Sequence, residues 1–266
     1  MQDKVKELLL GAAPCSIGKM GNVELMHFYP TFFYGRVSFA GNMLAVNAGL
    51  NFKDNKEYFI WVEDYARALN KIDCLLAWNH NDAEERIVEA ICKKPLIVEN
   101  FPDIEPFSHG KEGWHYELAD KRVLVISSFK DSIEAQIPNF SKIWPEAQIG
   151  AVEVIKMPQP HQITGDDTVY YNDVMWGISD QISSQNFDIC IIGAGGYSLP
   201  LCNFVKSIGK RAIHLGGATQ VLFGIRGSRF DRNFADQLWY GTDAFIRPLK
   251  SDIPKFHNLV EGSCYW

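Results

Sequence analysis

The 266-residue sequence lacks any long hydrophobic run. No stretch approaches the roughly 18 consecutive apolar residues that a membrane-spanning helix needs. The N-terminal stretch MQDKVKELLLGAAP has an apolar run that is too short for a signal peptide, and charged residues stand within it. We therefore expect a cytoplasmic protein without a membrane span.

Paired cysteines and an excess of positive charge are also missing. The six cysteines show no CxxC pair and no regular spacing, which argues against a disulfide framework or a zinc site. The formal net charge is −6, whereas a nucleic-acid-binding domain needs a basic surface. The sequence thus predicts reduced, mostly buried thiols and no nucleic-acid partner.

Two common nucleotide-binding motifs are absent as well. There is no GxxxxGK[ST] segment, which disfavours an ordinary P-loop NTPase. The stretch Gly193-Ala194-Gly195-Gly196 does not fit GxGxxG, and His214 stands near the position where a ribose-binding acid would be expected, which disfavours NAD. An S-adenosylmethionine site stays open, because those enzymes also use a glycine-rich loop, although here the loop comes late in the chain.

What the sequence does contain is an alternation of strand-like and helix-like segments. The hydrophobic content of 47% is ordinary for a globular protein with a sizeable core, in which we expect Trp61, Trp176 and Trp239 to pack. The expected helices cover 4–10, 22–29, 55–72, 82–94, 130–144, 167–186 and 198–209, with Asn22, Asp82 and Asp166-Asp167 as helix caps. The expected strands cover 14–21, 73–78, 95–100, 122–129, 151–158, 188–193 and 211–217.

This alternation predicts a Rossmann-like, doubly wound α/β fold with a mostly parallel sheet. We expect one domain over residues 1–266. A loop over 101–113 would separate two halves, 1–105 and 114–245, and an irregular tail, 246–266, would dock on the body.

Glycine and serine follow four of the predicted strands, at Gly18/Gly21, Ser127/Ser128, Gly193/Gly195/Gly196 and Gly216/Gly217. In a doubly wound sheet, ligands bind outside the carboxyl ends of the strands. Glycine permits a close backbone approach, and the start of a helix favours an anion. A turn explains any one of these glycines, but the whole set is better explained by a site for a phosphorylated ligand.

Four segments, in matching order, resemble the bacterial glycosyltransferases with the GT-D fold. CSIGKMGNVELMHF resembles the RFGDGE segment of that family, and VLVISSFKDSI and VIKMPQPHQI resemble its two middle strands, after which loops line the donor site. IIGAGGYSLPLCNFVKSIGKRAIHLGGATQ resembles its second signature, near the nucleotide-sugar pocket. The resemblance covers about Cys15 to Gly217.

The resemblance implies a GT-D-like enzyme that transfers a sugar from a nucleotide-diphosphate sugar, with a UDP-sugar favoured, to a glycan or glycoprotein acceptor. It also implies a divalent metal ion, Mn²⁺ or Mg²⁺, held by a D-x-E pair that appears here as Asn22-Val23-Glu24. Asn22 keeps a carbonyl oxygen but lacks the charge. Because the same residues also suit the start of a helix, a metal site and a purely structural role both stay open.

The other candidate residues follow from their places after strands. His214 stands where the family has an aspartate, so it would bind a donor phosphate, act as a general base or simply end a strand. Lys19 and Lys130 would neutralise the diphosphate or remain solvated surface charges, and Tyr197 would stack on the base or pack. The loop of Gln159, Pro160 and His161 would line the base or ribose pocket or form a plain proline-rich turn. The predicted catalytic residues are Glu24 and His214, and the predicted donor-binding residues are Gly18, Lys19, Ser127, Ser128, Lys130, Gln159, Gly193, Ala194, Gly195, Tyr197, Gly216 and Gly217.

Two other functions stay open. A glycine-rich loop in a doubly wound sheet also suits an S-adenosylmethionine-dependent methyltransferase. The replacement of the family's aspartate by Asn22 suits a non-catalytic nucleotide-sugar binder. The motifs GATQVLFGIRGSRFD and EGSCYW near the C-terminus indicate no function by themselves.

Overall fold

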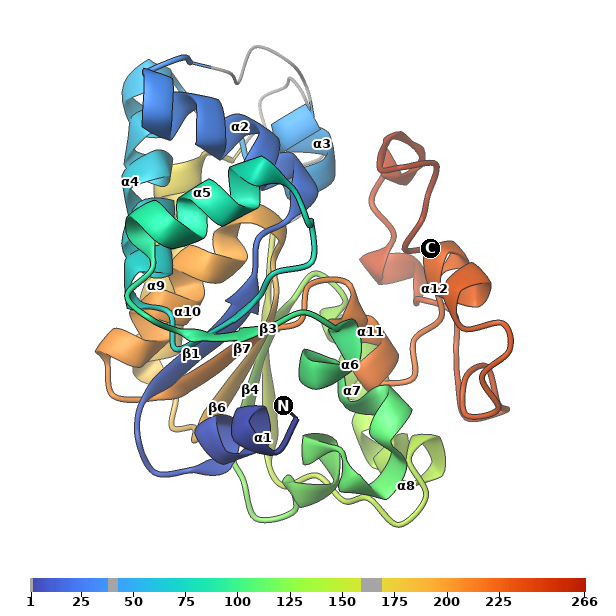
Figure 1. The fold of residues 1–266 in the computed structure, drawn as a ribbon. Helices are drawn as coiled ribbons and strands as arrows, with labels where there is room; N and C mark the ends of the chain where they lie inside the picture. Colours follow the sequence, from blue (N-terminus) through green and yellow to red (C-terminus); the bar gives the residue numbers. More distant parts are fainter. Residues whose placement is uncertain (1, 38–42, 159–168) are drawn as a thin grey trace.

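A computed structural model describes residues 2–37, 43–158 and 169–266. In this part of the chain, seven strands pair in parallel in the order β3-β2-β1-β7-β6-β4-β5 (Figure 1). The strands are β1 (Cys15–Lys19), β2 (Cys74–Leu76), β3 (Leu96–Val98), β4 (Val123–Ser127), β5 (Val152–Lys156), β6 (Ile189–Gly193) and β7 (Arg211–His214). The predicted α/β class with a doubly wound, parallel sheet is confirmed.

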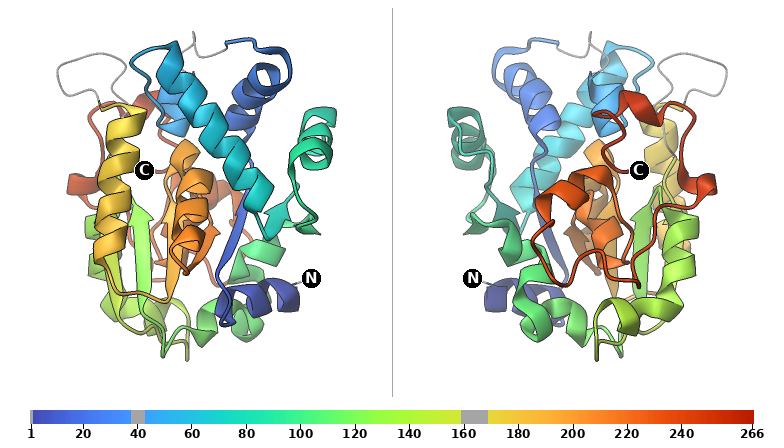
Figure 2. Two further views of the ribbon diagram at one scale, coloured as in Figure 1. Left: turned by 90° about the vertical axis from the view of Figure 1, so that its left-hand side faces the viewer. Right: turned by 90° about the vertical axis from the view of Figure 1, so that its right-hand side faces the viewer.

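Helices pack on both faces of this sheet (Figures 1 and 2). One face carries α2 (Asn22–Tyr34), α3 (Met43–Ala48), α4 (Asn55–Lys71), α5 (Asp82–Ile91), α9 (Tyr171–Ser184) and α10 (Ser198–Ser207). The other face carries α1 (Gln2–Leu10), α6 (Phe101–Ile104), α7 (Lys130–Gln136), α8 (Phe140–Ile143), α11 (Ala218–Leu222) and α12 (Ser228–Asn233). The result is a three-layer arrangement in which the sheet is the middle layer.

Strand β4 shows how the sequence produces two cores. Leu124 and Ile126 belong to the cluster under α4, α9 and α10, whereas Val123 and Val125 belong to the cluster on the opposite face. Successive side chains of a strand point to opposite faces of the sheet. Since both faces are covered by helices, the first four positions of β4 form a continuous hydrophobic run, and its last residue is Ser127 at the carboxyl edge.

The strand order creates a topological switch point in the middle of the sheet. The chain runs from β1 outward to β2 and β3, crosses to β4 and β5, and returns through β6 to β7 beside β1. The neighbours β4 and β6 therefore send their connections in opposite directions. In such sheets the crevice for a ligand lies beyond the carboxyl ends of the strands at this point. We call this side of the sheet the carboxyl edge.

Two predicted helix caps are one residue out of place. Gly21, not Asn22, is the N-cap of α2, and Asn22 is already helical. Asn81, not Asp82, caps α5, and its side chain accepts a hydrogen bond from Glu84 N at 3.0 Å. Asparagine and aspartate are both good N-caps, so composition alone does not choose between adjacent positions.

Two longer segments also differ from the sequence-based expectation. The predicted loop over 101–113 contains α6 and a 3₁₀ segment, η1 (Pro106–Glu112). The predicted helix over 130–144 is divided into α7, η3 (Ile137–Asn139) and α8. Pro138 has no backbone N–H to donate, and its ring disturbs the preceding turn, which explains the interruption.

Burial follows most of the remaining expectations. All six cysteines are free thiols, and all except the half-buried Cys92 are buried. Trp61 is fully buried, but Trp176 is 79% exposed, so its predicted packing is wrong.

The predicted cap at 166–167 lies outside the described residues. Within the described residues, no helix is both long enough and apolar enough to cross a membrane.

The β3–β4 connection contains a histidine that is fully buried among aromatic rings. His115 has no exposed surface, and its ring centroid lies 4.7 Å from that of Tyr116 and 4.8 Å from that of Trp144. Among the described residues, neither ring nitrogen has a hydrogen-bond partner. Burial, and secondarily the charge of His109, lowers the pKa of His115 to about 3.

This histidine predicts a loss of stability in mild acid. Because the folded-state pKa of about 3 lies below the ordinary value of 6.5, the unfolded chain binds the proton first as the pH falls. Stability is thus intact above the unfolded pKa and is lost as the pH falls toward the folded pKa. In urea unfolding, we expect the wild type to lose about 2 kcal/mol more than His115→Leu does between pH 7 and pH 4.5.

His80→Asn is the matched control, because His80 is exposed and its φ of 48° is one that asparagine tolerates. This control should follow the wild-type curve. Parallel curves for the wild type and His115→Leu would show that His115 takes up its proton without cost in the folded protein.

Candidate functional site

A cavity of about 670 Å³ lies at the carboxyl edge. Its volume falls within the roughly 300–1,000 Å³ that is usual for small-molecule sites. The predicted residues that line it are Lys19, Gly21, Asn22, Glu24, Ser127, Ser128, Gly193, Ala194, Gly195, Tyr197, His214, Gly216 and Gly217. The four glycine and serine turns named from the sequence therefore meet at one cavity.

Two predicted site residues, Gly18 and Lys130, do not line this cavity. Gly18 is inside β1, and a Cβ added there would meet the side chains of Leu199 and His214. Lys130 begins α7 and pairs with Glu134 at 3.5 Å on the surface. Gln159 lies outside the described residues.

The glycines after β6 and β7 permit close approaches around the cavity. A Cβ on Gly193 would lie 2.7 Å from Gly216 O, and a Cβ on Gly217 would lie 2.6 Å from a ring carbon of Tyr265. Gly216 has a φ of +61°, which favours glycine. Larger residues would push these turns apart, so the shape of the cavity depends on them.

Gly195 has a structural task as well as a place at the cavity. Its φ is +51°, and a Cβ there would overlap the carbonyl oxygen of Ala48 at the end of α3. A β-branched residue at this position would therefore strain the turn and separate it from α3. Tyr197 likewise packs, since its ring stacks on Tyr171 with the centroids 5.3 Å apart.

Glu24 places a buried carboxylate at the cavity. It lies in the first turn of α2 and is 8% exposed, and its carboxylate occupies the space beside the Cα of Gly21 where any other residue would have a Cβ. Burial raises the pKa of Glu24, and the charge of Glu261 across the cavity raises it further. The carboxyl group therefore holds a proton more readily than an ordinary glutamate does.

His214, at the end of β7, is neutral at physiological pH. It is 6% exposed, and burial, together with the charge of Lys19, lowers its pKa to about 3. Nδ1 lies 3.4 Å from Ile192 O, an oxygen that can only accept, so Nδ1 carries the hydrogen in this contact. The remaining nitrogen, Nε2, is then a hydrogen-bond acceptor and a weak base.

Lys19 is the last residue of β1 and brings a positive charge to the cavity. Its Nζ pairs with Glu105 at 2.8 Å, and the two side chains are only 13% and 12% exposed. The same Nζ lies 4.8 Å from the centroid of the Phe101 ring. Lys19 is therefore held in place from two sides.

The C-terminal segment, residues 246–266, supplies cavity residues that sequence reasoning missed. Glu261, Tyr265 and Trp266 line the cavity, together with Arg229 of α12. Arg229 lies over the Tyr265 ring at 4.7 Å, donates to Tyr265 Oη at 2.9 Å and pairs with Glu261. These residues belong to the motifs GSRFD and EGSCYW, which the sequence analysis noted without a function. Nothing in the sequence predicts that the two motifs lie beside the strand ends.

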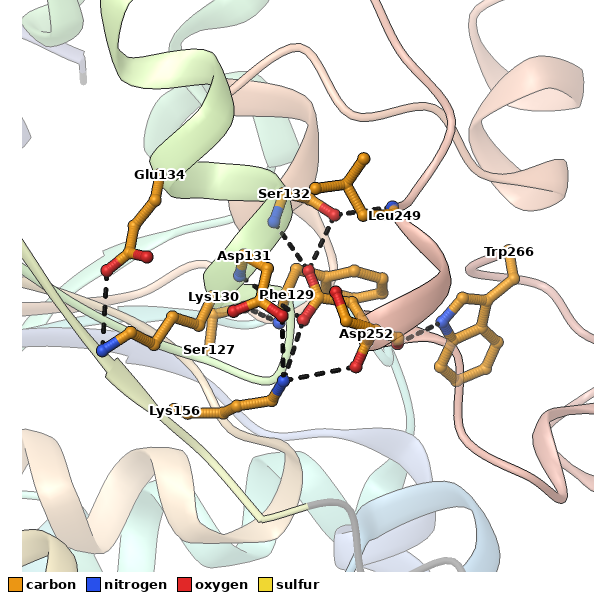
Figure 3. Close-up of polar contacts among 11 residues, drawn as sticks. Ser127, Phe129, Lys130, Asp131, Ser132, Glu134, Lys156, Leu249, Asp252 and Trp266 are labelled. Carbon is orange, nitrogen blue, oxygen red and sulfur yellow. Dashed lines mark hydrogen bonds and ion pairs between the residues drawn. The ribbon is translucent and has the colours of Figure 1, made fainter.

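A buried aspartate anchors the C-terminal segment to the body (Figure 3). Asp252 is fully buried and accepts hydrogen bonds from Ser132 N and Ser132 Oγ, both at 2.7 Å. It also pairs with Lys156 Nζ at 3.1 Å, and its carbonyl oxygen accepts a hydrogen bond from Trp266 Nε1 at 3.0 Å. Ser132 lies in α7, directly after β4, and Lys156 is the last residue of β5. Asp252 therefore joins the C-terminal segment to the carboxyl edge.

The expected metal pair does not fit the residues that are present. Among the described residues, no group of three or more His, Cys, Asp or Glu side chains is arranged to hold a metal ion. Asn22 is a neutral amide, so Glu24 is the one carboxylate of the expected pair. The pair therefore offers one anionic ligand where the family has two.

Comparison with known proteins gives no family for this chain. No protein-family model matches it, and no curated protein matches it.

The anchor predicts a large effect from one substitution. Asp252→Ala should lower the free energy of unfolding by about 1–3 kcal/mol, because it leaves the buried N–H and hydroxyl of Ser132 without their acceptor. Urea unfolding measures this loss. Limited proteolysis should also cut residues 246–266 more rapidly.

Glu134→Ala is the matched control, because it removes the exposed pair with Lys130 shown in the same view (Figure 3). It should cost less than about 1 kcal/mol. Equal losses for the two variants, with unchanged proteolysis, would show that Asp252 does not anchor the segment.

Proposed function

We propose that the protein is a glycosyltransferase that binds a nucleotide-diphosphate sugar in the cavity at the carboxyl edge and transfers the sugar to a glycan or glycoprotein acceptor. One observation carries this proposal: a single cavity of about 670 Å³ combines tight glycine turns, two basic side chains and a buried carboxylate. The glycine turns and the basic side chains suit a diphosphate, and the carboxylate suits the hydroxyl of an acceptor.

The aromatic side chains at the cavity suit the uncharged parts of such a donor. Trp78 and Phe101 line it with their ring centroids 5.2 Å apart, and Tyr265 and Trp266 line it from the C-terminal segment. Aromatic rings bind the apolar faces of sugars and stack on nucleobases. These four side chains are thus the surfaces on which we expect the base and the sugar to lie.

Glu24 is the better of the two predicted catalytic residues. In the proposed reaction, the acceptor oxygen bonds to the anomeric carbon, the bond from that carbon to the diphosphate breaks, and the acceptor proton passes to Glu24. A raised pKa brings this carboxylate closer to the working pH, as a general base requires. His214, with a pKa of about 3, is too weak a base and is left as a hydrogen-bond partner for the donor.

The first experiment identifies the ligand. A thermal-shift screen would compare UDP, GDP, ADP and CDP with their monophosphates, sugar conjugates of these diphosphates, and S-adenosylmethionine. A ligand at a hundredfold its Kd stabilises the folded protein by about 2.7 kcal/mol. We expect one nucleoside diphosphate to stabilise the protein more than its monophosphate does. Stabilisation by S-adenosylmethionine alone would replace this proposal with a methyltransferase.

The catalytic role of Glu24 predicts a selective loss of turnover. Glu24→Gln keeps the size of the side chain but cannot accept the proton. We expect it to slow release of nucleoside diphosphate from the sugar donor by about 10²- to 10⁴-fold while donor affinity changes less than about threefold. Chromatography of the released nucleotide measures the rate, and calorimetry measures the affinity.

Glu63→Gln is the control, because Glu63 is exposed on α4. It should behave as the wild type does. Wild-type turnover in Glu24→Gln would contradict the role of Glu24. If the wild type and all variants bind the donor tightly but release no nucleotide, the protein is a non-catalytic nucleotide-sugar binder, the alternative that Asn22 suggests.

A further inference from the structure

Two basic side chains, Lys19 and Arg229, line the cavity that contains the Gly216–Gly217 turn after β7. A Cβ on Gly216 would lie 3.7 Å from Lys19 Cε. The next residue, Gly217, packs against the ring of Tyr265, over which the Arg229 guanidinium lies at 4.7 Å. Lys19 thus lies beside this turn directly, whereas Arg229 is linked to it through the Tyr265 ring.

The same part of the cavity contains buried polar atoms without a partner. Thr219 and Gln220 are each 1% exposed and line the cavity, and among the described residues Thr219 Oγ1 and Gln220 Oε1 make no hydrogen bond. An unpaired buried polar atom is costly, and a bound ligand can satisfy it. The Thr219 hydroxyl can donate to an anionic oxygen.

Each basic side chain is already held by a carboxylate, but the two pairs differ in burial. The Lys19–Glu105 pair is about one-eighth exposed, whereas the side chains of Arg229 and Glu261 are 31% and 43% exposed. Lys19 can keep Glu105 and still donate to a phosphate, because an ammonium group has three N–H donors. Glu261 can turn toward solvent and leave its place on Arg229 to a phosphate.

On the basis of the function proposed above, we propose that Lys19 and Arg229 bind the two phosphate groups of the donor, with Thr219 donating to one of them. Binding of the diphosphate then needs no divalent cation. The charge that a metal ion would supply comes from the ammonium and the guanidinium, and the planar guanidinium can bind a phosphate with two hydrogen bonds. A binding mode of this kind needs no negative charge at Asn22.

The experiment measures binding of UDP, GDP, ADP and CDP to the purified full chain by calorimetry, in EDTA and in Mn²⁺. The variants are Arg229→Met and Lys19→Met. Arg232→Met is the matched control for the first, because Arg232 is exposed on the same helix and does not line the cavity. Lys130→Met is the control for the second.

We expect the wild type to bind one of these nucleotides with affinities in EDTA and in Mn²⁺ that agree within about threefold. Arg229→Met and Lys19→Met should each weaken this binding by about 10- to 100-fold and reduce its dependence on salt, because a charge-assisted hydrogen bond is lost. The two control variants should bind as the wild type does.

Glu261→Gln keeps the test decisive if a cation variant fails to fold. If Glu261 only competes with phosphate for Arg229, Glu261→Gln should bind the diphosphate at least as tightly as the wild type does. If Glu261 instead helps Glu24 to hold a metal ion, Glu261→Gln should weaken binding, and only in Mn²⁺.

The outcomes separate this inference from the proposed function. Nucleotide binding that requires Mn²⁺, or wild-type affinity in Arg229→Met and Lys19→Met, overturns the inference and leaves the proposed function standing. A wild type that binds none of the four nucleotides in either buffer overturns both.

Discussion

The parallel pairing of β1, β7, β6 and β4 is the constraint on which the candidate site depends. Because these strands run in one direction, their carboxyl ends lie at one edge, and the turns after them meet at one cavity. The glycines of these turns then let backbone approach backbone, as at Gly193 and Gly216. Helices on both faces leave this edge as the place where polar groups gather.

The cavity is completed by a segment that belongs to neither layer of helices. Residues 246–266 cross to the carboxyl edge, where buried Asp252 joins them to the start of α7 and the end of β5. Tyr265 from this segment packs against Gly217 and positions Arg229. The contacts of Asp252 thus hold in place the segment whose Tyr265 contacts Arg229 in the cavity. We therefore expect the stability of this segment and ligand binding by Arg229 to depend on each other.

The sequence predicts the seven strands and the cavity turns because both depend on local patterns, apolar runs followed by glycine or serine. It does not predict the pairing of β1 with β7 or the contact of Asp252 with Ser132, since each joins residues more than a hundred positions apart. The same limit explains Trp176, whose exposure depends on what covers its helix. Arg229 was missed for the same reason, because it becomes a site residue only when Tyr265 and Glu261 lie beside it.

Hydrogen–deuterium exchange in the presence of a nucleoside diphosphate tests the central claim most directly, since it reports which backbone amides the ligand protects. With the diphosphate that gives the largest thermal shift, the account predicts slower exchange in three stretches: 193–197, 214–220 and 260–266. The first two contain the turns after β6 and β7, and the third is the end of the C-terminal segment. Protection elsewhere on the molecule, or unchanged exchange in all three stretches, would contradict the account.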